Sequence, residues 1–370
     1  MKRASAALRA DVRAVAVPFI SARVLLVTAY VAALAIADRL LPGARPTAIT
    51  EGLVAWDGTW YRDIATHGYS ALPLEGLRFF PLFPMIGRGL GILFLGRVDL
   101  ALVVVANLCS FAVLVVLRRL LRRESVDEQT VDRTIWFFVL FPGAFVLAWA
   151  YAEAIWLLAA ITLFLAIRTR RWLLASLTGF IAGLSRPLGV VLAVPVFIEL
   201  MRNWGSTTRR ERAFGLLTVA SPLLGTGTYM LWVRSEFGNA WLPFSVQSDL
   251  RGSSMNPVSR LWEGISQVLG PERLGDGLHI PFAIGFLVLL IVVLRRLPVS
   301  YGALTACVLL TSLATENLNS LERYGLNAFP LVIALALVCQ RSEIDNSVRV
   351  TLAGGFVALS SMAWLGAYVP

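Results

Sequence analysis

The sequence is poor in the residues that mark soluble domains and most metal or redox sites. Only 15% of its 370 residues are charged, and it has one lysine, two histidines and three cysteines. Cys109, Cys307 and Cys339 lie in apolar runs with neither disulfide nor metal-ligand spacing, so we expect small core residues there. The low charge excludes an ordinary soluble domain. The net charge of +10 comes from arginines in short loops, which does not indicate a nucleic-acid-binding surface.

Long apolar runs take the place of these residues. Hydrophobic residues make up 57% of the chain, and its mean hydropathy is +0.73. Runs of about 20 apolar residues recur, which is the length that crosses the hydrocarbon core of a bilayer. The sequence therefore predicts an all-α polytopic membrane protein, with a single domain over residues 1–370 and no fixed repeat. We predict about eleven spans, near residues 17–41, 98–120, 133–149, 152–168, 172–185, 187–201, 213–233, 280–294, 299–315, 324–340 and 350–368.

Arginine clusters between the apolar runs give these spans an orientation. Because loops rich in arginine and lysine stay in the cytoplasm, we expect a cytoplasmic N-terminus and a first run that is a retained anchor rather than a signal peptide. Residues 42–97 and 234–279 then become long outer loops. Segment 79–96, interrupted by proline and glycine, is expected to lie in the interface or to be half-inserted. Arginine almost wholly replaces lysine, which indicates a GC-rich bacterial genome, so we expect a bacterial plasma membrane.

The stretch from Glu51 to Pro84 holds a dense group of polar and aromatic residues between apolar runs. Its first part predicts a helix that ends at Gly68, because glycine tolerates left-handed geometry. Asp57 falls in the middle of the apolar face of this helix, and Asp63 points elsewhere. A carboxylate on an apolar face is costly unless something uses or pairs it, so Asp57 is our first functional candidate. At about 100° per residue, its neighbours on that face are Leu53, Trp56, Trp60, Tyr61 and Ile64.

Other ionisable residues lie near the predicted outer ends of the spans, where such groups mark function by default. They are Arg78, Glu153, Arg186, Glu316, Glu322 and Arg323. Each has a structural alternative. Asp57 pairs with Arg78 or Arg62 in one alternative, and Arg186 reaches lipid headgroups in another.

The remaining polar residues near these ends have structural interpretations as well. The structural alternative for Glu322 and Arg323 is a surface ion pair between them. Glu153 is expected to satisfy the backbone of the turn in which it lies. His67 is expected to be a cation at a helix C-terminus, and His279 the polar start of a span.

The motifs in this stretch resemble the first outer loop of the PIG-V family of mannosyltransferases, which belong to the multi-span GT-C glycosyltransferases. The resemblance is densest over residues 50–90. It departs from the pattern of many GT-C enzymes, which carry two adjacent acidic residues here, whereas Asp57 precedes Gly58 and no metal-binding pair is present. The motifs are Trp56-Asp57-Gly58-Thr59-Trp60-Tyr61, Ile64-Ala65, Gly68-Tyr69 and Phe79-Phe80-Pro81-Leu82-Phe83-Pro84, with support from Ser185-Arg186-Pro187 and Arg323-Tyr324.

The resemblance implies a GT-C-like bundle with interfacial helices in the first outer loop. It also implies transfer of mannose, with inversion, from a polyprenyl-phosphate donor to a hydroxyl of a glycolipid, glycan or protein outside the cytoplasm, with no metal or other cofactor. Asp57 is then the expected general base, with a pKa raised by partial desolvation. Arg186, Arg323 and Arg78 are the expected ligands of the donor phosphate. The expected pocket residues are Trp56, Trp60, Tyr61, Glu322 and Tyr324.

Two other classes of protein stay open. A membrane transporter or lipid flippase also carries broken helices and intramembrane charge, although no inverted repeat is visible here. A non-catalytic subunit of a glycosyltransferase complex is the other class. Transport without transfer would favour the first, and a requirement for a partner would favour the second.

Overall fold

The computed structural model describes residues 2–40, 43–252, 255–270 and 274–370. Within them every regular element is helical, which confirms the all-α class. The predicted end of the first span at residue 41 and the predicted start of the first outer loop at residue 42 lie outside the described residues. The same is true of positions 253–254 and 271–273 in the second outer loop. The α-helices are α1 (Lys2–Leu40), α2 (Thr47–Glu51), α3 (Asp57–His67), α4 (Leu82–Gly91), α5 (Val98–Arg123), α6 (Glu128–Leu140), α7 (Glu153–Arg168), α8 (Trp172–Ser185), α9 (Ala193–Arg202), α10 (Arg209–Phe237), α11 (Leu242–Arg251), α12 (Pro257–Gln267), α13 (Asp276–Arg296), α14 (Val299–Leu313), α15 (Leu321–Asn327), α16 (Pro330–Val338) and α17 (Ser342–Trp364).

Several of these helices are long and apolar enough to cross a membrane. By length and composition, they are residues Ala6–Leu40 of α1 together with α5, α10 and α13. The pair α15 and α16, bent by 83°, adds a fifth crossing if it is one broken span. Each of the eleven predicted spans contains a helix. The chain is therefore a multi-pass helical membrane protein, and eleven complete crossings stay a prediction.

Two segments that we predicted as continuous helices, 133–149 and 324–340, are broken near a proline. Segment 187–201 begins as a 3-10 helix and continues directly as α9. Phe141 and Arg186 are extended directly before Pro142 and Pro187, because the proline ring disfavours the α conformation in the residue before it. Each proline starts a short 3-10 helix, η5 (Pro142–Leu147) or η6 (Pro187–Leu192). The breaks leave irregular backbone at one end of the bundle.

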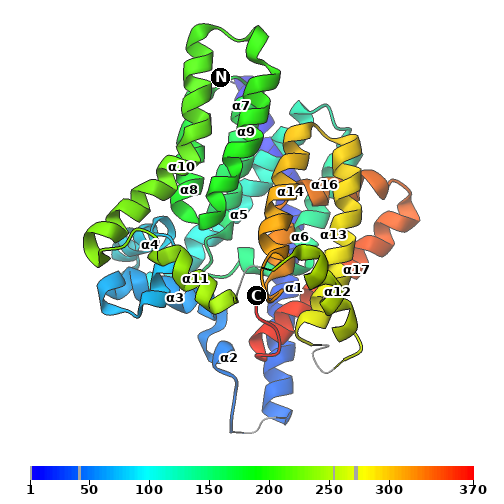
Figure 1. Cartoon of the computed structure of the whole chain (residues 1–370). Coiled ribbons are helices and arrows are strands. Elements are labelled where there is room, and N and C mark those ends of the chain that lie inside the picture. Colours follow the sequence, from blue (N-terminus) through cyan, green and yellow to red (C-terminus); the bar gives the residue numbers. More distant parts are fainter. Residues whose placement is uncertain (1, 41–42, 253–254, 271–273) are drawn as a thin grey trace.

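The two predicted outer loops contain helices of their own. Loop 42–97 holds α2, α3 and α4, and loop 234–279 holds α11, α12 and the start of α13. In Figure 1, α2, α3, α11 and α12 lie in the lower half of the view, opposite the N-terminus. The ten residues of α4 extend about 15 Å, which is too short to cross about 30 Å of hydrocarbon. These helices therefore gather at one end of the spans.

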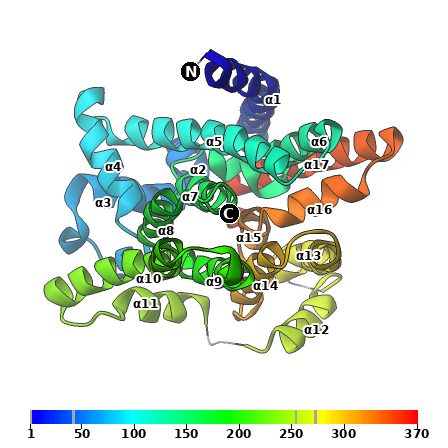
Figure 2. The same cartoon turned by 90° about the horizontal axis from the view of Figure 1, so that it is seen from above.

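Helix α7 lies at the centre of the bundle, between α5 and α8 (Figure 2). Most of its side chains are buried. Its last residue, Arg168, binds Glu124 and Glu199 at 2.5 Å each, near the end that holds the N-terminus. Loss of one partner from such a buried pair leaves an uncompensated charge. These pairs fix α7 to α5 and α9, and its first residue, Glu153, is thereby held at the opposite end.

Candidate functional site

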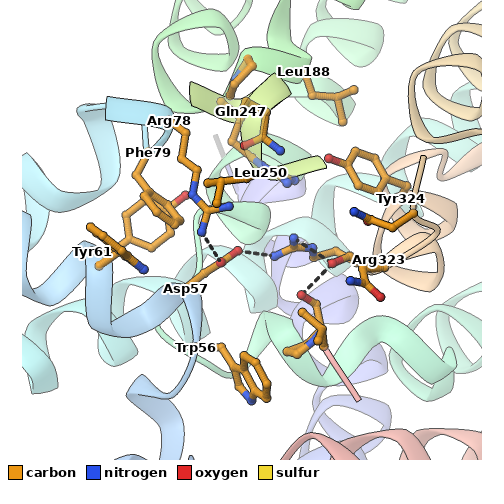
Figure 3. A pocket seen from close by; sticks show the side chains of 18 of the residues that line it. Trp56, Asp57, Tyr61, Arg78, Phe79, Leu188, Gln247, Leu250, Arg323 and Tyr324 are labelled. Carbon is orange, nitrogen blue, oxygen red and sulfur yellow. Dashed lines mark hydrogen bonds and ion pairs between the residues drawn. The ribbon is translucent and has the colours of Figure 1, made fainter. Parts of the chain in front are cut away.

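A cavity of about 830 Å³ opens where α3, the α8–η6 break and α15 meet. Its volume lies in the range of small-molecule sites. All the residues predicted for the site line it except Glu322. Figure 3 shows Asp57 between Arg78 and Arg323, with Trp56, Tyr61 and Tyr324 around them. The structure thus brings together side chains that are far apart in the sequence.

Asp57 is the first residue of α3 and shares its face with Trp60, Tyr61 and Ile64, whereas Leu53 and Trp56 of the predicted face precede the helix. Trp56 before it has a φ of 59°, in the left-handed region, and Leu53 lies in a separate 3-10 helix, Gly52–Val54. The Trp56 indole donates to the Ala363 carbonyl at 2.9 Å and holds this conformation. A carboxylate at a helix N-terminus is stabilised by the helix dipole. Left-handed non-glycine residues are costly and cluster at functional sites.

The Asp57 carboxylate is paired but still reachable from the cavity. Its Oδ2 accepts a hydrogen bond from Arg323 Nη1 at 2.6 Å, and its Oδ1 lies 4.0 Å from Arg78 Nη2. The side chain keeps 24% of its surface exposed. Arg62 binds Asp63 at 2.9 Å instead. Of the two alternatives for Asp57, the Arg78 ion pair is therefore present and the Arg62 pair is not.

The pKa of Asp57 moves in the direction opposite to our expectation. Burial alone would raise the pKa of this carboxyl, but the positive charges of Arg323, Arg78 and Arg186 outweigh it and leave the pKa below its ordinary value. An opposite charge within a few ångströms favours the charged form of a carboxyl group. Asp57 is therefore ionised at neutral pH when no anion is bound.

Glu153 is a functional candidate whose role the sequence concealed. Its side chain is 1% exposed, and Oε1 lies 3.0 Å from Arg186 Nη2 and 3.2 Å from Arg323 Nη1. Its expected role as a partner of the turn backbone is thus replaced by an ion pair with two arginines. The signal available in the sequence was a carboxylate and an arginine at two outer helix breaks, but only the fold makes those breaks adjacent.

We call Asp57, Arg78, Glu153, Arg186 and Arg323 the arginine–carboxylate cluster. It contains three cations and two anions, all joined by ion pairs. Three of its nitrogens, Arg78 Nε, Arg186 Nη1 and Arg323 Nε, are buried without a hydrogen-bond partner among the described residues. The excess positive charge suits a small anion, because arginine binds phosphate oxygens well.

The cavity has one apolar and one mixed wall. The mixed wall includes Trp60, whose ring stacks on Phe79 at 5.7 Å. Tyr61 is 5% exposed and packs edge-on against Phe79 and Phe83, so it supports this wall more than it offers a face to a ligand. Thr59 and Arg78 add polar groups. The apolar wall comes from η6 and α11 and includes Pro187, Leu188, Val190, Val191, Phe244 and Leu250.

Glu322 faces away from the cavity and is fully buried. Its oxygens contact His279 Nδ1 at 2.9 Å and accept a hydrogen bond from the Tyr368 hydroxyl at 2.8 Å. The surface ion pair weighed for Glu322 and Arg323 is therefore wrong, because both side chains are buried and have other partners. His279, expected as the polar start of a span, is a buried partner of this carboxylate. His67 lies exposed in the last turn of α3, as expected.

No group of three or more histidine, cysteine, aspartate or glutamate side chains in the described part of the chain is placed to hold a metal ion. Glu51 also lines the cavity, but its charged neighbours are Arg62 and Asp63. The charge inside the cavity therefore comes mainly from the arginine–carboxylate cluster.

No protein-family model and no curated protein matches this sequence. Two solved structures of an archaeal oligosaccharyltransferase from Archaeoglobus fulgidus are similar to the chain. The first is tethered to an acceptor peptide with an NVT sequon. It matches with a TM-score of 0.43 and 12% identity, and the match covers 94% of this chain and 56% of the oligosaccharyltransferase chain. The second is in complex with an inhibitory peptide and a dolichol-phosphate. It matches with a TM-score of 0.42 and 14% identity, and the match covers 92% of this chain and 55% of the oligosaccharyltransferase chain. This chain spans little more than half the length of either structure, and its resemblance to the PIG-V family is carried by sequence motifs alone.

Proposed function

We propose that this protein is a membrane glycosyltransferase that moves a mannosyl unit from a polyprenyl-phosphate donor to an acceptor hydroxyl on the extracytoplasmic face. The observation that carries the proposal is that Asp57 and the three arginines of the arginine–carboxylate cluster line one cavity together with aromatic and apolar side chains. A lipid-linked sugar phosphate has three matching parts: an apolar chain, an anionic phosphate and a polar sugar. Arg186, Arg323 and Arg78 are the proposed phosphate ligands.

Asp57 is the proposed general base. The acceptor oxygen forms a bond to the anomeric carbon on the face opposite the phosphate, and its proton passes to Asp57. The bond between the anomeric carbon and the phosphate oxygen breaks, and its electron pair leaves with the polyprenyl phosphate, which inverts the anomeric centre. Since Oδ2 is engaged by Arg323 at 2.6 Å and Oδ1 lies 4.0 Å from Arg78, Oδ1 is the oxygen that takes the proton.

The arginines also couple donor binding to the strength of the base. In the empty site their charges keep the pKa of Asp57 low. A bound phosphate neutralises part of that charge, which raises the pKa of the carboxyl and makes it a stronger base when the donor is in place. The same arginines stabilise the charge that develops on the leaving phosphate. We therefore expect transfer to continue in the presence of a chelator.

The test is to incubate the purified protein with radiolabelled polyprenyl-phosphate mannose and bacterial membrane extract, with and without EDTA, and to identify the labelled product. Transfer of label to an acceptor, by the wild type and not by Asp57→Asn, is the expected result. Movement of the labelled lipid across proteoliposomes without transfer would make the protein a transporter or flippase. Transfer that requires a second purified protein would make it a subunit of a complex.

A further inference from the structure

Glu153 is the most deeply buried member of the arginine–carboxylate cluster. Its side chain is 1% exposed, against 24% for Asp57, and it does not line the cavity. Its Oε1 lies 3.0 Å from Arg186 Nη2 and 3.2 Å from Arg323 Nη1. A carboxylate that does not touch the substrate, but touches two proposed phosphate ligands, acts on the reaction through them.

The fold holds Glu153 in this position. It is the first residue of the central helix α7, and its neighbours Ala152 and Ala154 are fully buried. Two guanidinium groups repel each other at short range, and a shared carboxylate oxygen removes that repulsion. Arg186 at the α8–η6 break and Arg323 on α15 are thereby kept side by side, although no backbone element links them directly. The spacing of the proposed phosphate site thus depends on Glu153.

Glu153 also sets the charge of the cluster. With three arginines and two carboxylates the cluster carries one net positive charge. The donor is a phosphodiester with one negative charge, whereas the product is a phosphate monoester with a charge of about −1.5 to −2 at neutral pH. Without the Glu153 charge the cluster would carry two positive charges, and the excess of its attraction for the product over its attraction for the donor would increase.

We propose that Glu153 is a positioning residue that spaces Arg186 and Arg323 and matches the cluster charge to the donor, so that polyprenyl phosphate is released after transfer. This inference rests on the proposed function of the site. Glu153, which lies outside the cavity, would then set the balance between donor binding and product release.

The test measures the dissociation constants of polyprenyl-phosphate mannose and of polyprenyl phosphate for the purified protein and for Glu153→Gln. The glutamine keeps the shape of the side chain and removes its charge. We expect the preference for polyprenyl phosphate over the donor to increase about tenfold, because one more uncompensated charge acts on the second charge of the product at short range. Inhibition of turnover by added polyprenyl phosphate should strengthen by the same factor.

Two further variants separate this role from a purely structural one. Glu199→Gln removes another buried carboxylate, paired with Arg168 at the opposite end of the bundle, and should leave the preference unchanged. Glu153→Asp keeps the charge but shortens the side chain, so affinity for both ligands should fall while their ratio stays as in the wild type. If Glu153→Gln fails to fold, Arg78→Gln, which lowers the cluster charge, should shift the preference towards the donor.

An equal loss of affinity for both ligands in Glu153→Gln would overturn the inference and leave Glu153 a structural residue. An unchanged preference in Arg78→Gln would overturn the charge match. Failure of the wild type to bind either ligand would contradict the proposed function instead, so the two failures are distinguishable.

Discussion

The guanidinium of Arg323 and the carboxylate of Asp57 form a hydrogen-bonded ion pair at 2.6 Å, although 266 residues separate them. They lie in the first turns of α15 and α3. Each helix follows a residue with a positive φ, Ser320 at 68° and Trp56 at 59°. Strain of this kind persists where the surrounding structure enforces it. The proposed base and a proposed phosphate ligand are therefore fixed relative to each other before a substrate binds, which is the preorganisation that electrostatic catalysis requires.

Asp57→Asn should abolish measurable transfer, through a loss of about 10²–10⁴-fold, while the protein still folds and inserts. The fold should survive because Arg323 keeps its ion pair with Glu153. Transfer rates and thermal unfolding of the purified variant are the measurements. Asp63→Asn on the same helix removes a carboxylate paired with Arg62 and is the matched control. Full activity of Asp57→Asn would remove the base assignment.

Arg323→Ala should mainly weaken binding of the donor. A hydrogen bond to a charged group contributes about 1.5–3 kcal/mol, which corresponds to roughly a 10- to 150-fold change in affinity. Arg323→Lys keeps the charge but not the planar donor pair, so it should fall between alanine and the wild type. Donor binding measured by titration of the purified variants tests both. If alanine left donor affinity unchanged, Arg323 would have no phosphate role.

The pH dependence of transfer should show the influence of the arginines on Asp57. Since the base must be ionised and its pKa is lowered, kcat/KM should fall only at acid pH, below the ordinary range of a carboxyl group. Arg78→Gln removes one of the lowering charges, so this acid limb should move to higher pH. The acid limb of kcat should lie at a higher pH than the acid limb of kcat/KM, because the bound phosphate offsets the positive charge of the arginines. Coincident limbs in the wild type and Arg78→Gln would show that Arg78 does not tune the base.

The same shift has a consequence for stability. The folded-state pKa of Asp57 lies below its unfolded value, so its ion pairs stabilise the fold at neutral pH. That contribution is fully present above the unfolded pKa and is lost as the pH falls through the lowered folded value. Acid destabilisation should therefore begin near the unfolded pKa, at a higher pH than the loss of transfer, which follows the lowered folded-state pKa.

The sequence predicted the helical class and most of the charged residues that line the cavity, because hydrophobic length and out-of-place charge are local signals. Asp57, Arg186 and Arg323 were found as charges at helix ends. The roles of Glu153 and Glu322 were not found, because each depends on which helix breaks become neighbours in space. The pKa direction of Asp57 was missed because its own segment suggests desolvation, whereas two of the three arginines that oppose it, Arg186 and Arg323, come from distant segments.

Gly143 in η5 is the point where the broken helix meets the backbone of α15. A Cβ atom there would lie 2.8 Å from the Glu322 carbonyl carbon and 2.9 Å from the Arg323 nitrogen. Gly143→Ala should therefore displace α15, destabilise the protein by about 1–3 kcal/mol and reduce transfer through a misplaced Arg323. Thermal unfolding and transfer rates of the variant are the measurements. Gly285→Ala on α13, where a Cβ would meet no atom within 4 Å, is the control and should not destabilise. Equal effects of the two substitutions would contradict the close approach.

Helix α12 presents different chemistry on each of its faces. Arg260 and Gly264 are buried, and α12 packs on α13. At about 100° per residue, a second, exposed sector is apolar and a third is polar, with Glu263. The apolar sector contains Val258, Trp262 and Ile265, of which Trp262 is 77% exposed. An exposed apolar face beside a polar one is typical of helices that lie in the plane of a membrane interface, so we predict this placement for α12, beside the candidate span α13.

Spin labels on α12 test this placement in proteoliposomes. In a background with Cys109, Cys307 and Cys339 replaced by alanine, a nitroxide is attached to Trp262→Cys or, as the matched control one residue on, to Glu263→Cys. We expect the label at 262 to be relaxed mainly by oxygen, which concentrates in lipid, and the label at 263 mainly by a water-soluble nickel complex. Relaxation of both labels by nickel would place α12 in water. Protection of the 262 label from both reagents would mean that a protein surface, and not lipid, covers this face.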